Sequence, residues 1–392
     1  MITRLLDLKH LLGKTSHSAL LFGPRGSGKT RLSLGFLHEQ PPVRIFDLLD
    51  NANYTRFLTD PSLFQQEVKS GLKPGHLLTV FVDEVQRLPQ LLNDVHSLIE
   101  SHKGKIRFLL TGSSARKLKR GGANLLAGRA WTLHLHPLTH REGVGNLRRA
   151  LSFGTLPAIY LDEASPERSL KAYVDTYLKE EIQQEALTRK VEGYVRFLEV
   201  AAQMNGAPLN FSSIARDCGV SMPTAQEFFS ILVDTMIAFR VEGWSWSVRK
   251  QLRQSPKLYF FDCGVLNAVR GELTTELKSG SFRYGLLFET FIVQEICRLN
   301  DYQETGFKMY YWRSNSGMEV DLVLSRSPSD RPVAVEIKST TAPTSKDLRG
   351  LHSFKSENKH ARLFCFCQTP RPYEVDGVKI LPWKDGLATL FP

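Results

Sequence analysis

Residues 23–30 have the side-chain types and spacing that bind phosphate groups. They fit the pattern G-x4-G-K-[ST] and read, in order, Gly23, Pro24, Arg25, Gly26, Ser27, Gly28, Lys29 and Thr30. Glycines let backbone N–H groups converge on phosphate oxygens, and the N-terminus of a following helix adds its dipole. Lys29 is expected to reach the β- and γ-phosphates, and the Thr30 hydroxyl is expected to bind Mg²⁺. The segment therefore predicts a site for ATP with Mg²⁺.

Two carboxylates follow the apolar residues 77–82. Asp83, at the tip of the predicted strand, suits Mg²⁺ directly or through water, whereas Glu84 suits polarising the water that attacks a phosphate. The plain alternative is a solvated acidic pair at a strand end. Ser113 follows the predicted strand 106–111 and is our candidate for contacting the γ-phosphate, against a simple turn residue. Together these residues predict hydrolysis of the nucleotide rather than binding alone.

A mostly parallel sheet is needed to bring these residues to one edge. Short apolar runs at 18–22, 43–48, 77–83, 106–111 and 131–135 alternate with longer amphipathic segments. Such alternation is typical of α/β units. The phosphate-binding segment follows the first run and precedes a predicted helix that begins near Lys29, which is the context that the pattern requires.

The middle of the chain is predicted to be helical. Residues 151–205 have apolar residues near period 3.6, and residues 209–238 have the order of a helix–turn–helix, with a winged form favoured. Small Ala215 would let the two helices cross closely, Gly219 would supply the turn, and Ser221 would cap the second helix, in whose first turn Pro223 is tolerated.

Whether this region binds DNA is left open by its charges. The second helix would present Met222, Thr224, Gln226 and Glu227, with no Lys or Arg for phosphate or guanine. The segment after it offers a basic wing that could contact phosphates through Arg249, Lys250 and Arg253. The basic residues 116–122 are a second candidate DNA contact. The alternatives are a domain that packs on the nucleotide-binding part and regulates it, and a solvated loop at 116–122.

The last third of the chain contains carboxylates and a lysine in an order that can bind metal. Glu289 lies in a predicted helix over 285–299, Asp321 in a strand over 320–324, and Glu336 closes a strand over 333–337. Lys338 lies two residues after Glu336, so both side chains point to the same face. Asp321 and Glu336 could bind one or two Mg²⁺ ions, while Lys338 would orient a water or offset charge on a cleaved phosphate. This PD-(D/E)xK constellation is similar to restriction enzymes and Holliday-junction resolvases, although Val320 stands where the pattern has proline.

Residues 23–30, 83–86, 111–114 and 126–129 together resemble an AAA-type ATPase. More narrowly, nearly the whole chain resembles prokaryotic ATPases of the signal-transduction (STAND-like) branch that carry a C-terminal restriction-endonuclease-like domain. The resemblance implies that Arg129 stabilises charge on the γ-phosphate, of its own or of a neighbouring subunit; the alternative is an ion pair with a structural carboxylate. It also favours a homo-oligomeric ring.

The composition fits this interpretation. The net charge of +11 favours nucleic acid or another polyanion as partner. No apolar run approaches the roughly 20 residues of a membrane span, and the five scattered cysteines fit a reducing compartment. We therefore expect a cytoplasmic protein that does not act on membranes.

The sequence thus predicts an α/β protein of three domains. Residues 1–145 form a P-loop AAA-type ATPase domain, 146–270 a helical and winged-helix domain, and 271–392 a restriction-endonuclease-like domain. The first functional hypothesis is an ATP-hydrolysing protein that processes DNA, with branched or structured DNA favoured. The second is a nucleotide-gated switch that acts on a protein partner without cleaving DNA.

Overall fold

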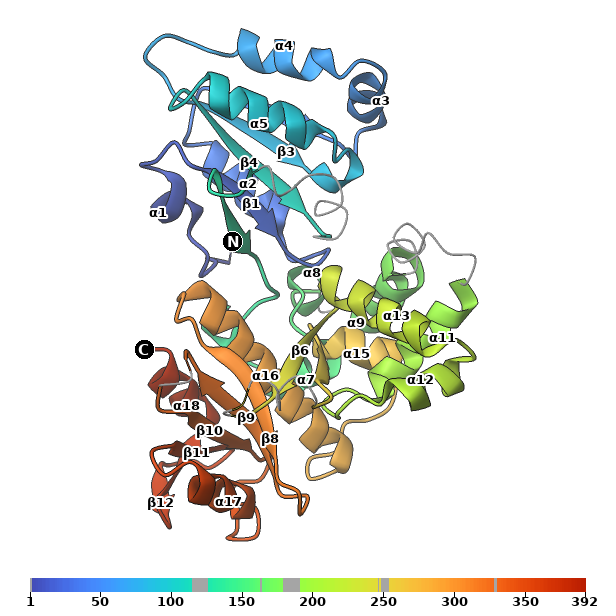
Figure 1. The fold of residues 1–392 in the computed structure, drawn as a ribbon, viewed down its shortest axis with the longest axis vertical. Coiled ribbons are helices and arrows are strands. Elements are labelled where there is room, and N and C mark those ends of the chain that lie inside the picture. The colour runs from blue at the N-terminus through green and yellow to red at the C-terminus, as the bar shows by residue number, and fades with distance from the viewer. Residues whose placement is uncertain are drawn as a thin grey trace. The chain divides into compact units, whose positions relative to one another are not determined.

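The computed structural model describes residues 2–114, 126–162, 164–178, 191–245, 247, 254–327 and 330–392. The chain folds into two compact units. The smaller comprises Met1–Leu138 with Asp234–Ile237, and the larger comprises Thr139–Val233 with Ala238–Pro392 (Figure 1). The first border lies seven residues before the predicted one at 145. The predicted border at 270 falls inside the larger unit, so the middle and C-terminal segments share one compact body.

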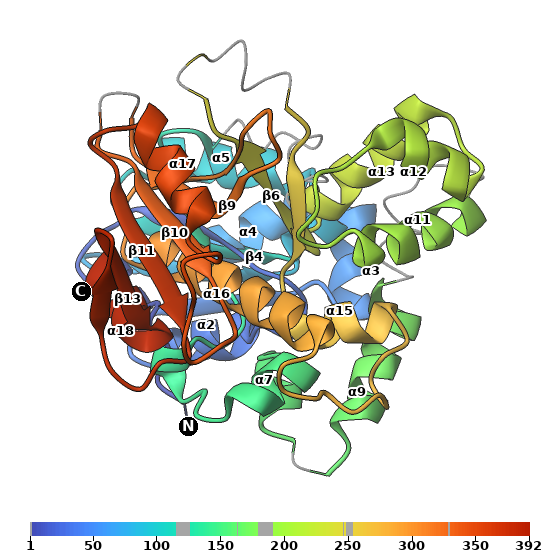
Figure 2. The ribbon, with the colours of Figure 1, turned by 90° about the horizontal axis from the view of Figure 1, so that it is seen from below.

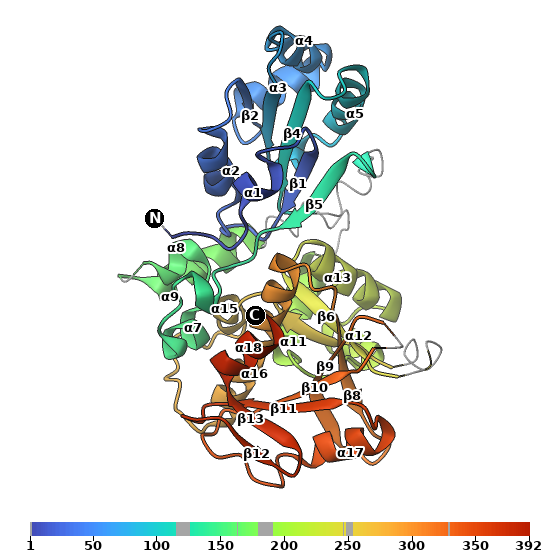
Figure 3. The same cartoon turned by 90° about the vertical axis from the view of Figure 1, so that its left-hand side faces the viewer.

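The smaller unit is a parallel five-stranded sheet of order β2-β3-β4-β1-β5. Its strands are β1 Ser18–Phe22, β2 Val43–Asp47, β3 Leu78–Asp83, β4 Ile106–Gly112 and β5 Ala130–His134. Its helices are α1 Leu8–Leu12, α2 Lys29–Leu37, α3 Asn51–Thr59, α4 Ser62–Ser70, the 3₁₀ turn η1 Val85–Arg87 and α5 Leu91–Ser101. Helix α2 covers one face of the sheet and α5 the other (Figure 3).

The burial of each strand agrees with its place in the sheet. Strands β1, β3 and β4 are buried throughout, as expected for central parallel strands covered on both faces, whereas the edge strands β2 and β5 are partly exposed. The predicted runs match the strands to within one residue at each end. Since all five strands are parallel, the loops after β1, β3 and β4 meet at one edge of the sheet.

The larger unit contains a mixed sheet of order β12-β13-β11-β10-β9-β8-β6-β7. Its strands are β6 Ala238–Gly243, β7 Lys257–Phe260, β8 Lys308–Arg313, β9 Glu319–Ser325, β10 Val333–Ile337, β11 Arg362–Cys367, β12 Tyr373–Val375 and β13 Val378–Pro382. The long helix α16, Phe282–Tyr302, contacts β7 and β10, helix α17, Arg349–Glu357, packs on β9 and β10, and helix α18, Trp383–Leu390, packs on β11 and β13. Figure 2 shows this arrangement from below.

The remaining helical segments precede or flank this sheet. They are η3 His140–Glu142, α7 Leu147–Phe153, α8 Pro157–Tyr160, α9 Pro166–Ala172, the π-helical η4 Tyr173–Leu178, α11 Val191–Gln203, α12 Phe211–Cys218, α13 Met222–Asp234 and α15 Cys263–Val269. None of the helices in the described ranges is long and apolar enough to cross a membrane.

The predicted pair of helices around Gly219 is α12 and α13. Gly219 ends α12 in the left-handed conformation at φ 67°, and the Ser221 hydroxyl accepts a hydrogen bond from the Thr224 N–H at 3.4 Å. An antiparallel hairpin of β6 and β7 follows, and β6 also joins β8 through the pairs Glu242–Tyr310 and Gly243–Tyr311. The predicted DNA contacts at 116–122 and at Arg249, Lys250 and Arg253 lie outside the described residues.

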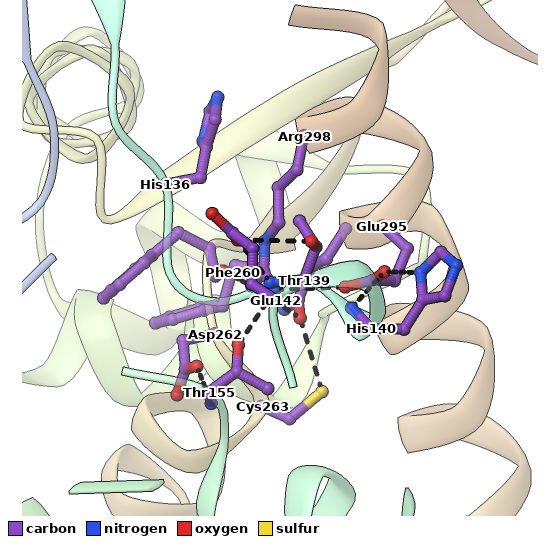
Figure 4. A network of polar contacts seen from close by, with 12 residues as sticks. His136, Thr139, His140, Glu142, Thr155, Phe260, Asp262, Cys263, Glu295 and Arg298 are labelled. Atoms are coloured by element: carbon purple, nitrogen blue, oxygen red, sulfur yellow. Dashed lines mark hydrogen bonds and ion pairs between the residues drawn. The ribbon is translucent and has the colours of Figure 1, made fainter. Parts of the chain in front are cut away.

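A buried polar network fixes α16 within the larger unit (Figure 4). Arg298 of α16 donates to the Thr155 hydroxyl at 2.9 Å, and the Thr155 N–H donates to Asp262 at 2.6 Å. Glu295 of α16 accepts the backbone N–H of His140 at 2.9 Å. The network therefore connects the residues after the unit border, the end of α7 and the start of α15 to α16.

Candidate functional site

The phosphate-binding segment has the backbone that its glycines predicted. Gly26 and Gly28 adopt φ values of 80° and 95°, which side chains disfavour, and α2 begins at Lys29. A Cβ atom at Gly23 would lie 2.3 Å from the Leu135 carbonyl oxygen, so only glycine fits there. The buried Lys29 ammonium donates to the Gly23 carbonyl at 2.8 Å. The segment thus folds as a loop whose lysine lies against its own backbone.

Thr30 and Asp83 meet at the ends of α2 and β3. The Thr30 hydroxyl donates to one carboxylate oxygen of Asp83 at 2.7 Å, and the Thr111 hydroxyl donates to the other. Burial raises the pKa of Asp83 from its ordinary value, against the two hydroxyl hydrogen bonds, which lower it. A buried carboxylate beside a hydroxyl is the donor set that Mg²⁺ prefers. Sequence reasoning did not assign Thr111, whose position at the end of β4, the strand next to β3, brings it to Asp83.

Glu84 and Ser113 lie side by side next to this pair. Glu84 has φ 56° and ψ 48°, a conformation that costs a non-glycine residue energy and that clusters at functional sites. Its carboxylate lies 3.9 Å from the Lys29 ammonium and accepts hydrogen bonds from Gln86 and, at 3.4 Å, from the Ser113 hydroxyl. Gln86 also donates to Ser113 at 2.9 Å. The strained backbone therefore directs Glu84 toward the lysine and the predicted γ-phosphate contact; the bridging Gln86 was not predicted as a site residue.

Arg129 lies at the opposite edge of the same sheet. It directly precedes β5, whose first residue pairs with the first residue of β1, while the phosphate-binding loop follows the last residue of β1. At about 3.3 Å per residue, the length of β5 separates the Arg129 backbone from the loop by roughly 17 Å. Its guanidinium donates to Glu100 at 2.5 Å. The structure thus brings Lys29, Thr30, Asp83, Glu84 and Ser113 together but not Arg129.

The first site fits a nucleotide and Mg²⁺. Besides the glycine backbone, the fully buried Ser27 hydroxyl has no hydrogen-bond partner among the described residues. Buried polar groups normally have one, so an acceptor such as a phosphate oxygen would satisfy it. Arg4 steadies the loop from the N-terminus by donating to the Ser27 carbonyl at 2.7 Å and to the His136 carbonyl at 2.6 Å. Arg4 was not predicted, because only the fold brings it to the loop.

A second cluster forms in the larger unit from the four residues predicted there. Lys338 donates to Glu336 at 2.5 Å and lies 3.9 Å from Asp321, which accepts the backbone N–H of Ile337 at 2.7 Å. Burial raises the pKa of Glu336 well above its ordinary value, and that of Glu289 to about 7, with the Asp321 charge adding to both shifts. Burial disfavours the Lys338 ammonium, but Asp321 and Glu336 outweigh it and raise its pKa. The helix and the two strands therefore assemble one buried charged group.

Sequence reasoning missed two members of this cluster, both on β7. The Tyr259 hydroxyl donates to Glu289 at 2.7 Å, and the Lys257 ammonium pairs with Glu319 at 2.5 Å. Burial disfavours the Lys257 ammonium, but Glu289 and Asp321 raise its pKa. The alternation Lys257-x-Tyr259 signals one face of a strand, but no sequence pattern places that strand beside α16.

In the described ranges, no three His, Cys, Asp or Glu side chains form a group that could hold a metal ion.

The sequence was compared with known protein families. Residues 15–144 match a family model described as an AAA domain. Residues 144–276 and 284–385 match two domains of unknown function, DUF8612 and DUF4143. The first two matches meet at residue 144, and the second and third are separated by residues 277–283.

Two mycobacterial proteins and one solved structure were also found. Uncharacterized proteins Rv2008c of Mycobacterium tuberculosis and Mb2031c of Mycobacterium bovis are each 28% identical over 350 residues, which cover 88% of this chain and 76% of theirs. The structure of C. elegans PCH-2 aligns with a TM-score of 0.25 and 15% sequence identity. The alignment covers 45% of this chain and 44% of the PCH-2 chain, which is less than half of each. With its parallel sheet, phosphate-binding loop and family match, the N-terminal part of this chain is an AAA-type P-loop ATPase domain.

Proposed function

We propose that this protein couples ATP hydrolysis in its AAA-type domain to an action on DNA by its larger unit. The observation that carries the proposal is the convergence of Glu289, Asp321, Glu336 and Lys338 into one buried cluster in a chain that also holds an ATPase site. The net charge of +11 supports DNA as the partner, and branched or structured DNA is the favoured form.

In the ATPase site, Lys29 would bind the β- and γ-phosphates once it leaves the Gly23 carbonyl, and Thr30 and Asp83 would hold Mg²⁺, which offsets phosphate charge. Glu84 would accept a proton from the attacking water, and Ser113 would contact the γ-phosphate. Arg129 is too far from the loop of its own chain, so any role in hydrolysis requires a second copy. We therefore include a homo-oligomer in the proposal.

The larger unit is proposed to contain a restriction-endonuclease-like domain. The order α16-β8-β9-β10-α17-β11 and the positions of the four charged residues support this assignment. Asp321 and Glu336 would hold a divalent cation, since one buried oxygen of Glu336 has no hydrogen-bond partner among the described residues. Lys338 would orient a water or offset phosphate charge during cleavage of a phosphodiester bond.

The segment before it is proposed to be a winged helix that holds DNA. Helices α11, α12 and α13 followed by the β6–β7 hairpin support this assignment. Helix α13 has no Lys or Arg, so its exposed side chains would contribute hydrogen bonds rather than phosphate contacts.

The second candidate is a nucleotide-gated switch acting on a protein partner. The lack of Lys and Arg in α13 and the finding that no three described residues form a metal-holding group both favour it. In this case the buried cluster would serve as a retained structural element.

The two candidates differ in how ATP turnover responds to DNA. We would measure turnover with Mg²⁺ alone and with single-stranded, duplex, forked and four-way DNA, using Lys29→Ala as the blank. The proposal expects stimulation by one DNA form and cleavage of that form, which Asp321→Asn abolishes. Turnover that is indifferent to every DNA would favour the switch. Cleavage that persists in Asp321→Asn would exclude the buried cluster as its source.

A further inference from the structure

Phe282 is the most exposed of the large hydrophobic side chains in the described parts of the chain. It is 86% exposed, whereas the next of them, Leu161, is 54% exposed. It is the first residue of α16 and directly follows the cap Ser281. A ring so exposed contributes little to the core, since an aromatic side chain stabilises a fold by being buried. Single exposed apolar side chains are normal, so the position of Phe282 decides whether the ring has a function.

Phe282 begins the helix that supplies Glu289 to the buried cluster. The residues Phe282, Leu286 and Glu289 follow the spacing i, i+4, i+7, so they lie on one face of α16. A Cβ atom at Gly206 would lie 3.4 Å from Glu289 and 3.9 Å from Leu286, so both face the same neighbour. At 1.5 Å per residue, Phe282 precedes Glu289 by about 10 Å along the helix axis. The ring is therefore two turns from the cluster, on the cluster's side of the helix.

The buried cluster reaches solvent at Lys338. The Lys338 side chain is 29% exposed, whereas those of Asp321 and Glu336 are mostly buried. Ser339, the next residue, lies beside the first turn of α16, because a Cβ atom at Gly285 would be 3.6 Å from the Ser339 hydroxyl oxygen. The first turn of α16 therefore borders the exposed side of the cluster.

Hydrogen bonds hold this turn in place. The Tyr284 hydroxyl donates to the Gln368 side chain at 3.3 Å, and the Gln368 amide donates to the Ser339 carbonyl at 2.7 Å. The Ser281 hydroxyl accepts the Tyr284 N–H at 3.2 Å and caps the helix. The Phe282 ring thus projects from a fixed backbone next to the opening.

The charges around the start of α16 favour a polyanion. Residues 270–283 contain two carboxylates, and both are paired with arginines: Glu272 with Arg270 and Arg283, and Glu276 with Arg148. Lys278 is exposed and forms no ion pair among the described residues. The surplus of positive charge beside Phe282 suits phosphate groups on either side of a base that contacts the ring.

We propose that the Phe282 ring stacks on a nucleobase of the DNA whose phosphodiester group enters the buried cluster at Lys338. The inference rests on the proposed function in taking DNA as the substrate. Inside a duplex both faces of a base are covered by its neighbours, so only a base at a branch, an end or a single-stranded stretch offers a free face.

The geometry also indicates which base is recognised. About three steps of 3.4 Å along a strand span the roughly 10 Å between Phe282 and Glu289. Phe282 therefore favours DNA that has a free base about three nucleotides from the phosphate in the cluster. It is a specificity-determining residue, because the ring contacts the substrate away from the reacting atoms.

The test is the affinity of the full chain for forked DNA, measured by fluorescence anisotropy with Mg²⁺ and ATP present. Relaxed circular duplex, which has no ends, competes for binding and gives the affinity for DNA without free bases. All proteins carry Asp321→Asn, so that the forked DNA stays intact during the measurement. Phe282→Ala is expected to weaken binding of the forked DNA about tenfold and to leave the affinity for the circle unchanged.

Tyr373→Ala is the matched control. It removes another exposed ring, from the edge strand β12 of the same sheet, and should change neither affinity. Because Phe282 and Tyr373 are both exposed, both variants should keep the melting temperature of the parent protein.

Two further measurements separate ring stacking from general apolar contact. Phe282→Leu keeps an apolar side chain without a ring and should lose nearly as much affinity as Phe282→Ala, whereas Phe282→Trp should retain it. On the DNA side, one abasic position within about five nucleotides of the fork should weaken binding about tenfold when Phe282 is present. The same abasic position should have no effect on Phe282→Ala, because the stacking partner is already missing.

Equal affinity of the Phe282 and Phe282→Ala proteins for forked DNA, or full affinity in Phe282→Leu, would overturn the inference and leave an action on DNA in place. A preference for forked DNA that depends on Phe282, with no cleavage by the protein that retains Asp321, would refute the nuclease role while the inference stands. A protein that binds none of these DNA forms would defeat both.

Discussion

Glu289 makes the stability of the larger unit depend on pH. Burial, followed by the negative charge of Asp321, raises its pKa from an ordinary 4.5 to about 7. In the unfolded chain this carboxyl loses its proton near pH 4.5, whereas in the folded protein it keeps the proton to about pH 7. Between these values the folded state binds the additional proton. The free energy of unfolding should therefore decrease as pH rises through this window, and the loss should be complete above pH 7.

The size of the effect follows from the shift. A change from 4.5 to about 7 is worth about 3 kcal/mol, at about 1.4 kcal/mol for each pH unit. Glu289→Gln cannot ionise and keeps a side chain of the same shape. The variant should lack this decrease and become more stable than the wild type, by up to about 3 kcal/mol, above pH 7.

Urea unfolding between pH 4.5 and 8, with a chelator present, measures the difference. Trp244 and Trp312 are buried in the larger unit, so tryptophan fluorescence reports its unfolding. Glu357→Gln, at an exposed position of α17, is the matched control and should follow the wild type. If Glu289→Gln showed the same dependence on pH as the wild type, the carboxyl would titrate as it does in the unfolded chain, and the reasoning from burial would be wrong.

Three further predictions concern other parts of the chain. Lys29→Ala should lower ATP turnover by about 100-fold or more, because it removes the charge that faces the developing phosphate charge; near-normal turnover would exclude the loop as the hydrolysis site. Arg129→Ala should also lower ATP turnover. If Arg129 acts at the ATPase site of a neighbouring copy, mixing the Arg129→Ala and Lys29→Ala proteins should restore part of the turnover. No recovery on mixing would mean that Arg129 acts only as an ion-pair partner of Glu100. Gly154→Ala should destabilise the protein by about 3–4 kcal/mol, because its Cβ would lie 1.8 Å from an Asp262 oxygen and its backbone has a φ of 71°. Gly143→Ala, at φ 96° with open space around it, should lose only about 1–2 kcal/mol, from backbone strain alone. Comparable losses of stability for the two variants in thermal unfolding would contradict the steric account.

The parallel sheet of the ATPase domain could be predicted because its signals are local. Each central strand is an apolar run buried along its whole length, and the loop that follows β1 carries a nearly unique pattern of glycines with Lys29. The strands β9 and β10 were also predicted to within one residue at each end. Asp83, Glu84 and Glu336 at strand ends and Glu289 in a long helix could be named in advance, whereas Thr111 at the end of β4 was not assigned.

Contacts between distant segments could not be predicted. Strand β6 pairs with β8 across a long stretch of sequence, and the predicted wing was given no strand bounds, so Lys257 and Tyr259 were missed. Arg129 was proposed from resemblance alone, and only the register of β5 on β1 shows that it lies at the opposite edge of the sheet from the loop. The sequence analysis gave an ion pair with a structural carboxylate as the alternative role for Arg129, and in the structure Arg129 forms such a pair with Glu100.

The place of β6 beside β8 has a practical consequence for dissecting this protein. A fragment that begins near residue 284, where the last family match starts, would retain Glu289, Asp321 and Glu336 but not β6 or β7. Strand β8 would then present a row of unpaired backbone groups to solvent, which invites association between copies of the fragment. The same cut would remove Lys257 and Tyr259 from the carboxylates. Activity or self-association measured on such a fragment would therefore not represent the intact protein. Deletion variants should keep the β6–β7 hairpin.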